Sequence, residues 1–128
     1  MMYKIHDHET VLIFNKSSRK GKQTLAYLIG LTPNVRQVDT QKDSVSPSYW
    51  KEILKRLELH PKEVMDKSLP YYQEHIRGRD FDSESWLKVL SKNPQLLRSP
   101  IVITGDRAVL IDNPSEVSQI KASVKTAN

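Results

Sequence analysis

The first third of the chain contains two short apolar runs with an amphipathic stretch between them. Thr10–Phe14 is a continuous apolar run, which is typical of a strand buried on both faces of an α/β sheet. Residues 25–29 then place leucine and isoleucine at helical spacing, and this helix is expected to end near residues 30–33. Residues 35–38 form a second short apolar run. The pattern therefore predicts a β-α-β unit with parallel strands.

The middle of the chain carries helix signals only. Ser46 and Pro47 suit the N-cap and the first position of a helix. One apolar face follows, made by Trp50, Ile53, Leu54 and Leu57. Pro61 starts a further short helix, and Asp82 is expected to cap another that carries Trp86, Leu87 and Leu90. We expect a helical insertion over residues 46–92, with both tryptophans in the core.

The last third of the chain predicts a hairpin and a final helix. Two apolar runs at 100–104 and 108–111 flank a turn at Gly105 and Asp106. Asn113-Pro114-Ser115-Glu116 has the pattern of a capping box, so a helix is expected over residues 114–124. The fold class is thus α/β, with four strands near residues 10–15, 34–39, 100–104 and 108–111. All 128 residues are expected to form a single domain.

This order of elements is that of a thioredoxin-like (glutaredoxin-like) four-stranded mixed sheet with a helical insertion. The local sequence resembles the glutaredoxin-coupled arsenate reductase family, which also contains the Spx-type transcription regulators. The matching segments, in chain order, are Asn15 to Ser18, Thr24-Leu25, Asn93-Pro94-Gln95-Leu96-Leu97, Pro100-Ile101-Val102 and Pro114-Ser115-Glu116-Val117. Their order and spacing carry the resemblance over residues 10–120.

The resemblance assigns four functional positions, and this chain departs from the family at each. The catalytic cysteine falls on Ser18, and the three arginines that bind the oxyanion fall on Asp66, Ser99 and Asn113. Arg98 adjoins one of these positions, but in an extended segment a shift of one residue turns a side chain to the opposite face. We therefore expect Arg98 to be a poor substitute.

The chain contains no cysteine, and this excludes thiol redox chemistry of its own. A serine hydroxyl stays protonated and forms no mixed disulfide, whereas reduction needs a thiolate. The leading hypothesis is a redox-inactive arsenate reductase-like protein that serves as a binding or regulatory module. The alternative is an arsenate reductase-type oxidoreductase, or another enzyme that acts on an oxyanion substrate.

Charge leaves two interpretations of the loop before the first helix. The chain has a formal net charge of +5. The loop either binds a small anion or is simply solvated, and the candidate residues for binding are Lys16, Ser17, Ser18, Arg19 and Lys20. The resemblance to Spx-type regulators implies a protein partner of the RNA polymerase class.

Other classes of site and compartment find little support. His6-Asp7-His8-Glu9 has metal-ligand residue types, but such residues near a chain end are usually solvated, and we expect no metal and no cofactor. No apolar run approaches the ~20 residues that cross a bilayer, so we expect no membrane contact and a cytoplasmic location.

The resemblance to thioredoxin-like proteins also implies that the peptide bond before Pro100 is cis.

Overall fold

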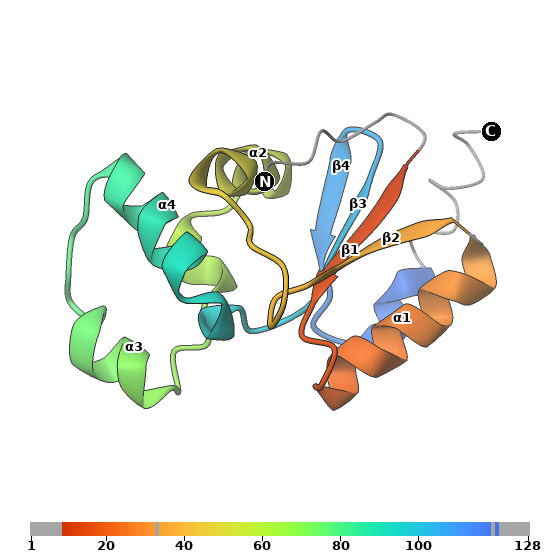
Figure 1. Ribbon diagram of the computed structural model, residues 1–128, viewed down its shortest axis with the longest axis horizontal. Helices are drawn as coiled ribbons and strands as arrows, with labels where there is room; N and C mark the ends of the chain where they lie inside the picture. Colours follow the sequence, from red (N-terminus) through yellow and green to blue (C-terminus); the bar gives the residue numbers. More distant parts are fainter. Residues whose placement is uncertain (1–8, 33, 119, 121–128) are drawn as a thin grey trace.

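A computed structural model describes residues 9–32, 34–118 and 120 and places four strands in one mixed sheet (Figure 1). The strands are β1 (Thr10–Phe14), β2 (Val35–Asp39), β3 (Ile101–Thr104) and β4 (Arg107–Leu110). Their order across the sheet is β2-β1-β3-β4. β2 runs parallel to β1, whereas β3 is antiparallel to both β1 and β4. The predicted β-α-β unit and the hairpin are therefore confirmed.

One face of the sheet is covered by α1 (Arg19–Leu31) and the segment after β4. Leu12 and Phe14 of β1 point to this side and pack with Leu28 of α1. The segment after β4 begins with η3 (Pro114–Glu116), and Val117 packs into the same cluster. This face of the sheet thus holds α1 close to the segment that follows β4.

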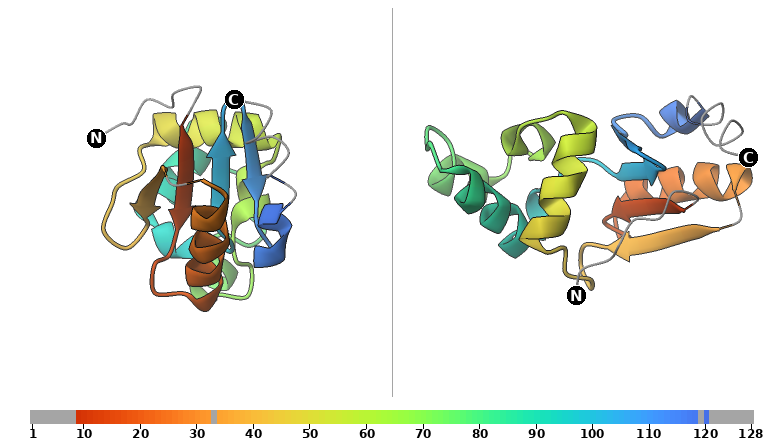
Figure 2. Two further views of the ribbon diagram at one scale, coloured as in Figure 1. Left: turned by 90° about the vertical axis from the view of Figure 1, so that its right-hand side faces the viewer. Right: turned by 90° about the horizontal axis from the view of Figure 1, so that it is seen from above.

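The opposite face carries the predicted helical insertion (Figure 2). It consists of α2 (Pro47–Leu57), η1 (Pro61–Val64), α3 (Pro70–His75), α4 (Ser83–Lys92) and η2 (Pro94–Leu96). Trp50 and Trp86 are 1% and 3% exposed and join Val11 and Ile13 of β1 in the larger core cluster. The prediction that both tryptophans belong to the core is confirmed.

The helix starts follow the predicted capping residues. Ser46 and Asp82 cap α2 and α4 through their side-chain oxygens. Asn113 and Glu116 form the predicted capping box, although the first turn after it is a 3₁₀ turn. Val117, Ser118 and Ile120 continue helically, and the rest of the predicted final helix lies outside the described residues, as do residues 6–8. No helix in the described part of the chain has the length and apolar content that a bilayer crossing requires.

Candidate functional site

Ser18 stands directly before α1 and uses its hydroxyl to hold the start of that helix. Its Oγ accepts a hydrogen bond of 2.9 Å from the backbone N–H of Gly21 and donates one of 3.0 Å to the carbonyl of Asn15. The backbone N–H of Ser18 donates to the same carbonyl at 3.0 Å. Serine is among the preferred N-cap residues because it satisfies an otherwise unpaired helical N–H. The Ser18 hydroxyl therefore has a structural role, which is to cap α1.

Gly21 is required by the tight approach of this loop to α1. A Cβ atom on Gly21 would lie 2.4 Å from the carbonyl oxygen of Asn15 and 2.8 Å from Ser18 Oγ. The first of these is a backbone atom, which cannot rotate away as a side chain can. The glycine thus allows Asn15 and Ser18 to close the turn against the helix.

Several donor groups of the loop that carries Lys16 and Ser17 form hydrogen bonds within the chain. The N–H of Lys16 donates to Asp39 Oδ1 at 3.3 Å, and the N–H of Ser17 donates to Asn15 Oδ1 at 2.9 Å. The Ser17 hydroxyl donates to Gln41 Oε1 at 2.7 Å. These donors already have acceptors, so they are not available to an anion at Lys16 and Ser17. Anion binding by this loop stays a prediction.

Ser99 lies next to the N-terminal turn of α1 and is almost fully buried, with 4% of its surface exposed. Its Oγ accepts a hydrogen bond of 3.2 Å from Lys20 Nζ and donates one of 3.1 Å to Asp112 Oδ1. Arg98 Nη1 forms an ion pair with the same carboxylate oxygen. Three segments that lie far apart in the sequence therefore meet through Lys20, Ser99 and Asp112.

Arg98 is exposed and Ser99 is buried, as expected for neighbouring side chains on opposite faces, yet the long Arg98 side chain reaches the same carboxylate as Ser99. Whether Arg98 can take the place of the family's arginine stays a prediction. Arg98 Nε also donates to the carbonyl of Glu63 at 2.9 Å, and its N–H donates to the carbonyl of Val64 at 2.9 Å. These bonds hold the arginine between the helical insertion and Asp112.

Asp66 belongs to the segment that pairs with the residues before β3. An isolated bridge joins Met65 to Leu97, and the N–H of Asp66 donates to the carbonyl of Leu96 at 2.7 Å. Asp66 Oδ1 accepts hydrogen bonds from the N–H of Ser68 at 3.0 Å and from its hydroxyl at 2.6 Å. An open cavity of about 400 Å³ lies here, lined by Glu63, Met65, Asp66, Lys67 and Arg98. Asp66 and Arg98 thus share one cavity.

Asn113 contributes to a turn rather than to this cavity. Its Oδ1 accepts a hydrogen bond of 3.2 Å from the N–H of Ser115, and its own N–H donates to Glu116 Oε1 at 2.6 Å. The side chain of Asn113 is therefore engaged in the capping box. Its neighbour Asp112 is the residue that faces Ser99.

The prediction of a cis bond before Pro100 is wrong, because no peptide bond among the described residues is cis. A trans bond is the preferred isomer even before proline, by about 0.5–1 kcal/mol. The N–H of Ile111 donates to the carbonyl of Pro100 at 2.8 Å and fixes this segment against the end of β4. Ser99 still meets Lys20, so the trans bond brings the segment to α1.

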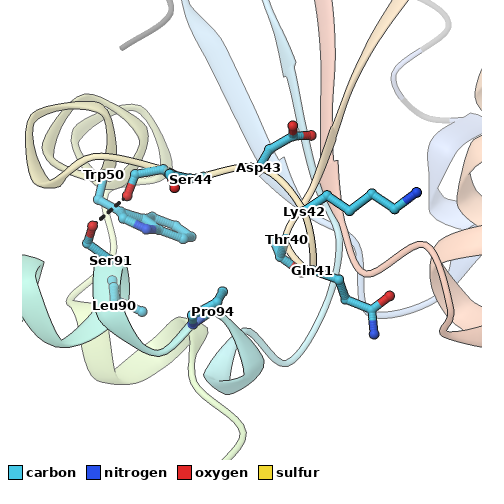
Figure 3. Close-up of a pocket in the computed structure, with 10 residues that line it drawn as sticks. Thr40, Gln41, Lys42, Asp43, Ser44, Trp50, Leu90, Ser91 and Pro94 are labelled. Carbon is cyan, nitrogen blue, oxygen red and sulfur yellow. Dashed lines mark hydrogen bonds between the residues drawn. The ribbon is translucent and has the colours of Figure 1, made fainter. Parts of the chain in front are cut away.

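A second, smaller cavity of about 170 Å³ was not predicted from the sequence (Figure 3). It lies between the loop after β2 and the C-terminal part of α4, and Ser91 Oγ donates to the carbonyl of Val45 at 2.7 Å across this boundary. Its lining residues are Thr40, Gln41, Lys42, Asp43, Ser44, Val45, Trp50, Leu90, Ser91 and Pro94. The mixed polar and apolar lining indicates no single ligand chemistry.

The sequence matches the model of the ArsC family over residues 14–120. This chain belongs to the ArsC family. No curated protein matches it. The match begins at the last residue of β1 and includes the helical insertion, the β3–β4 hairpin and the four positions that the resemblance assigns to the catalytic cysteine and the arginines.

Solved structures show the same thioredoxin-like fold. A candidate arsenate reductase from Yersinia pestis has a TM-score of 0.80 at 23% identity, covering 88% of this chain and 100% of that one. The arsenate reductase from Vibrio cholerae has a TM-score of 0.79 at 22% identity, with coverage of 88% and 97%. A candidate ArsC-family-related protein from Bacteroides fragilis has a TM-score of 0.72 at 16% identity, with coverage of 88% and 98%.

The sequence analysis missed Asp112 and assigned Lys20 a different contact. The sequence did contain a signal for Asp112. It is a carboxylate directly before Asn113, a position that the resemblance assigns to arginine. Lys20 was considered only as part of an anion-binding loop, whereas its ammonium group contacts Ser99. A bond between residues 79 positions apart leaves no trace in local sequence spacing.

Proposed function

We propose that this protein is a redox-inactive member of the ArsC family that acts as a binding or regulatory module in the cytoplasm. The observation that carries the proposal is the state of Ser18. It stands at the position that the resemblance gives to the catalytic cysteine, in a chain without any cysteine, and its hydroxyl caps α1. A hydroxyl held in this way supplies neither a thiolate nor a leaving sulfur.

The three positions assigned to arginines support the same proposal. Asp66 places a carboxylate in the cavity beside Arg98, and a carboxylate repels an arsenate anion. Ser99 and Asn113 are short, uncharged side chains, and both are engaged within the chain. Bidentate recognition of an oxyanion requires guanidinium groups that are free to turn toward it. The fold of a reductase is thus kept without the groups that its chemistry needs.

We propose a protein partner, and RNA polymerase is the class that the resemblance to Spx-type regulators suggests. The net charge of +5 favours an acidic partner surface. Three exposed cations near the start of α1, Lys16, Arg19 and Lys22, supply positive charge on one side of the molecule. The first turn of α1 contains no acidic residue to offset them.

The partner proposal is tested by measuring binding of the purified chain to purified RNA polymerase by surface plasmon resonance. The test variant is Lys16→Glu/Arg19→Glu/Lys22→Glu. The matched control, Lys51→Glu/Lys55→Glu/Lys88→Glu, makes the same charge change at exposed positions on α2 and α4. We expect the unaltered chain and the control to bind, and the test variant to lose binding. An unaltered chain that does not bind, or equal loss in both variants, contradicts this partner.

A further inference from the structure

Asp112 is the acceptor on which several donors of the candidate site converge. Its Oδ1 accepts the hydroxyl proton of Ser99 at 3.1 Å and forms the ion pair with Arg98. Lys20 donates to that same Ser99 hydroxyl at 3.2 Å. Asp112 therefore accepts directly from Ser99 and Arg98, and Lys20 of α1 is linked to it through the Ser99 hydroxyl.

The backbone holds Asp112 at this place. Ile111 is fully buried, and its N–H donates to the carbonyl of Pro100 at 2.8 Å. This bond fixes the chain at the end of β4 beside Ser99, so that the next side chain faces the hydroxyl. The Asp112 side chain itself is 56% exposed, and its carboxylate is therefore open to exchange with solvent.

We propose that Asp112 is an internal anion that occupies the site of an oxyanion and excludes it. This inference deepens the proposed function, because it names the group that keeps tetrahedral oxyanions away from the same donors. Arg98, Ser99 and Lys20 are chemically suited to an oxyanion, since they offer a guanidinium group, a hydroxyl and an ammonium group. In this chain the Asp112 carboxylate binds Arg98 and Ser99 instead, and Ser99 in turn accepts from Lys20.

Removing the carboxylate changes the charge that a ligand meets. Lys20 and Arg98 together with Asp112 carry a local charge of about +1, and replacing Asp112 by asparagine raises it to about +2. Arg98 Nη1 then loses its carboxylate partner and can donate to an oxyanion, while Nε keeps its bond to the carbonyl of Glu63. The neutral amide of asparagine keeps nearly the same shape, so the change isolates charge.

The experiment is a titration of backbone amide chemical shifts with inorganic phosphate. The unaltered chain is compared with Asp112→Asn and with Asp106→Asn, a matched control with the same charge change in the exposed turn between β3 and β4. We expect Asp112→Asn to bind phosphate about fivefold more tightly than the unaltered chain, the size expected for a partly exposed ion pair. The shifts should cluster at Lys20, Arg98 and Ser99.

Two further variants make the outcome decisive. Asp112→Ser replaces the asparagine variant if that variant fails to fold, and Asp112→Asn/Arg98→Gln should lose the gained affinity. A gain that is absent in both single variants at Asp112, or equal in Asp106→Asn, overturns the inference and leaves the proposed function intact. Arsenate turnover by the unaltered chain would instead overturn the proposed function, whatever the phosphate titration shows.

Discussion

Lys20 donates a hydrogen bond of 3.2 Å to the hydroxyl of Ser99, and this contact joins the first turn of α1 to the segment before β3. It shows that Ser99 lies beside the helix that Ser18 caps. Because Ser99 also donates to Asp112, the contact continues to the chain that leaves β4. The site is thus assembled from three segments and satisfied within the molecule.

A cysteine introduced at the N-cap of α1 should become an unusually acidic thiol. In Ser18→Cys the sulfur would receive the N–H of Gly21 that the hydroxyl now accepts. Helix N-termini and nearby cations lower a thiol pKa from about 8.5 toward 3.5–7.5. The measurement is the rate of alkylation by iodoacetamide as a function of pH. Ser17→Cys is the control, and equal pKa values for the two thiols would show that this site does not stabilise a thiolate.

The turn before α1 should not tolerate a side chain at Gly21. Because a Cβ there would lie 2.4 Å from a backbone oxygen, Gly21→Ala should lower the free energy of unfolding by about 1–3 kcal/mol. Gly30→Ala is the control in the same helix, where a Cβ meets nothing within 4 Å. It should raise the free energy by about 0.5–1 kcal/mol. Urea denaturation of both variants checks the pair, and similar values for the two would contradict the packing described.

Most of the fold follows from local patterns in the sequence. The continuous apolar run of β1 predicts a buried strand because both of its faces are covered, as Leu12 and Ile13 show by entering opposite clusters. Ser46 and Asp82 mark helix starts because an N-cap side chain acts on its own neighbours. These features depend on residues a few positions apart, which sequence spacing records.

The site was predicted less completely, because its contacts join distant segments. Strand alternation predicts that Arg98 and Ser99 lie on opposite faces, but it does not predict that the long Arg98 side chain reaches Asp112. The cis bond before Pro100 was carried over from a resemblance, and no local feature of the sequence specifies the isomer. The role of Asp112 depends on Ser99 and Arg98 lying beside it, which only the fold reveals.

Asp82 should stabilise α4 in a pH-dependent way. The hydrogen bond from the N–H of Ser85 to its carboxylate lowers the pKa of Asp82 below the ordinary value of 3.8. This contribution is fully present above pH 3.8 and is lost as the pH falls through the lower pKa of the folded state. Asp82→Ala should therefore be less stable than the unaltered chain near neutral pH, with a difference that shrinks in acid.

Thermal unfolding of both proteins from pH 7 to pH 2 measures this effect of Asp82. Asp80→Ala serves as the control, because it removes a carboxylate from the exposed loop just before the cap. A stability difference between Asp82→Ala and the unaltered chain that stays constant over this pH range would contradict the capping role.

The whole chain should unfold as one cooperative unit, as expected for a single domain. β1 contributes Val11 and Ile13 to one core cluster and Leu12 and Phe14 to the other. Unfolding of β1 therefore disrupts both clusters together. Tryptophan fluorescence reports the cluster that contains Trp50 and Trp86, and far-UV circular dichroism reports the whole backbone. The two denaturation curves should coincide. An earlier fluorescence transition would indicate that the helical insertion is a separate unit.

The central claim is that this ArsC-family chain carries out no arsenate reduction. The direct measurement is turnover of arsenate by the purified, unaltered protein in an assay coupled to glutathione and glutaredoxin, with the Vibrio cholerae arsenate reductase assayed in parallel. We predict a rate no higher than that of the assay without this protein, and only partial recovery in Ser18→Cys, because Asp66, Ser99 and Asn113 remain. Robust turnover by the unaltered chain would contradict the account.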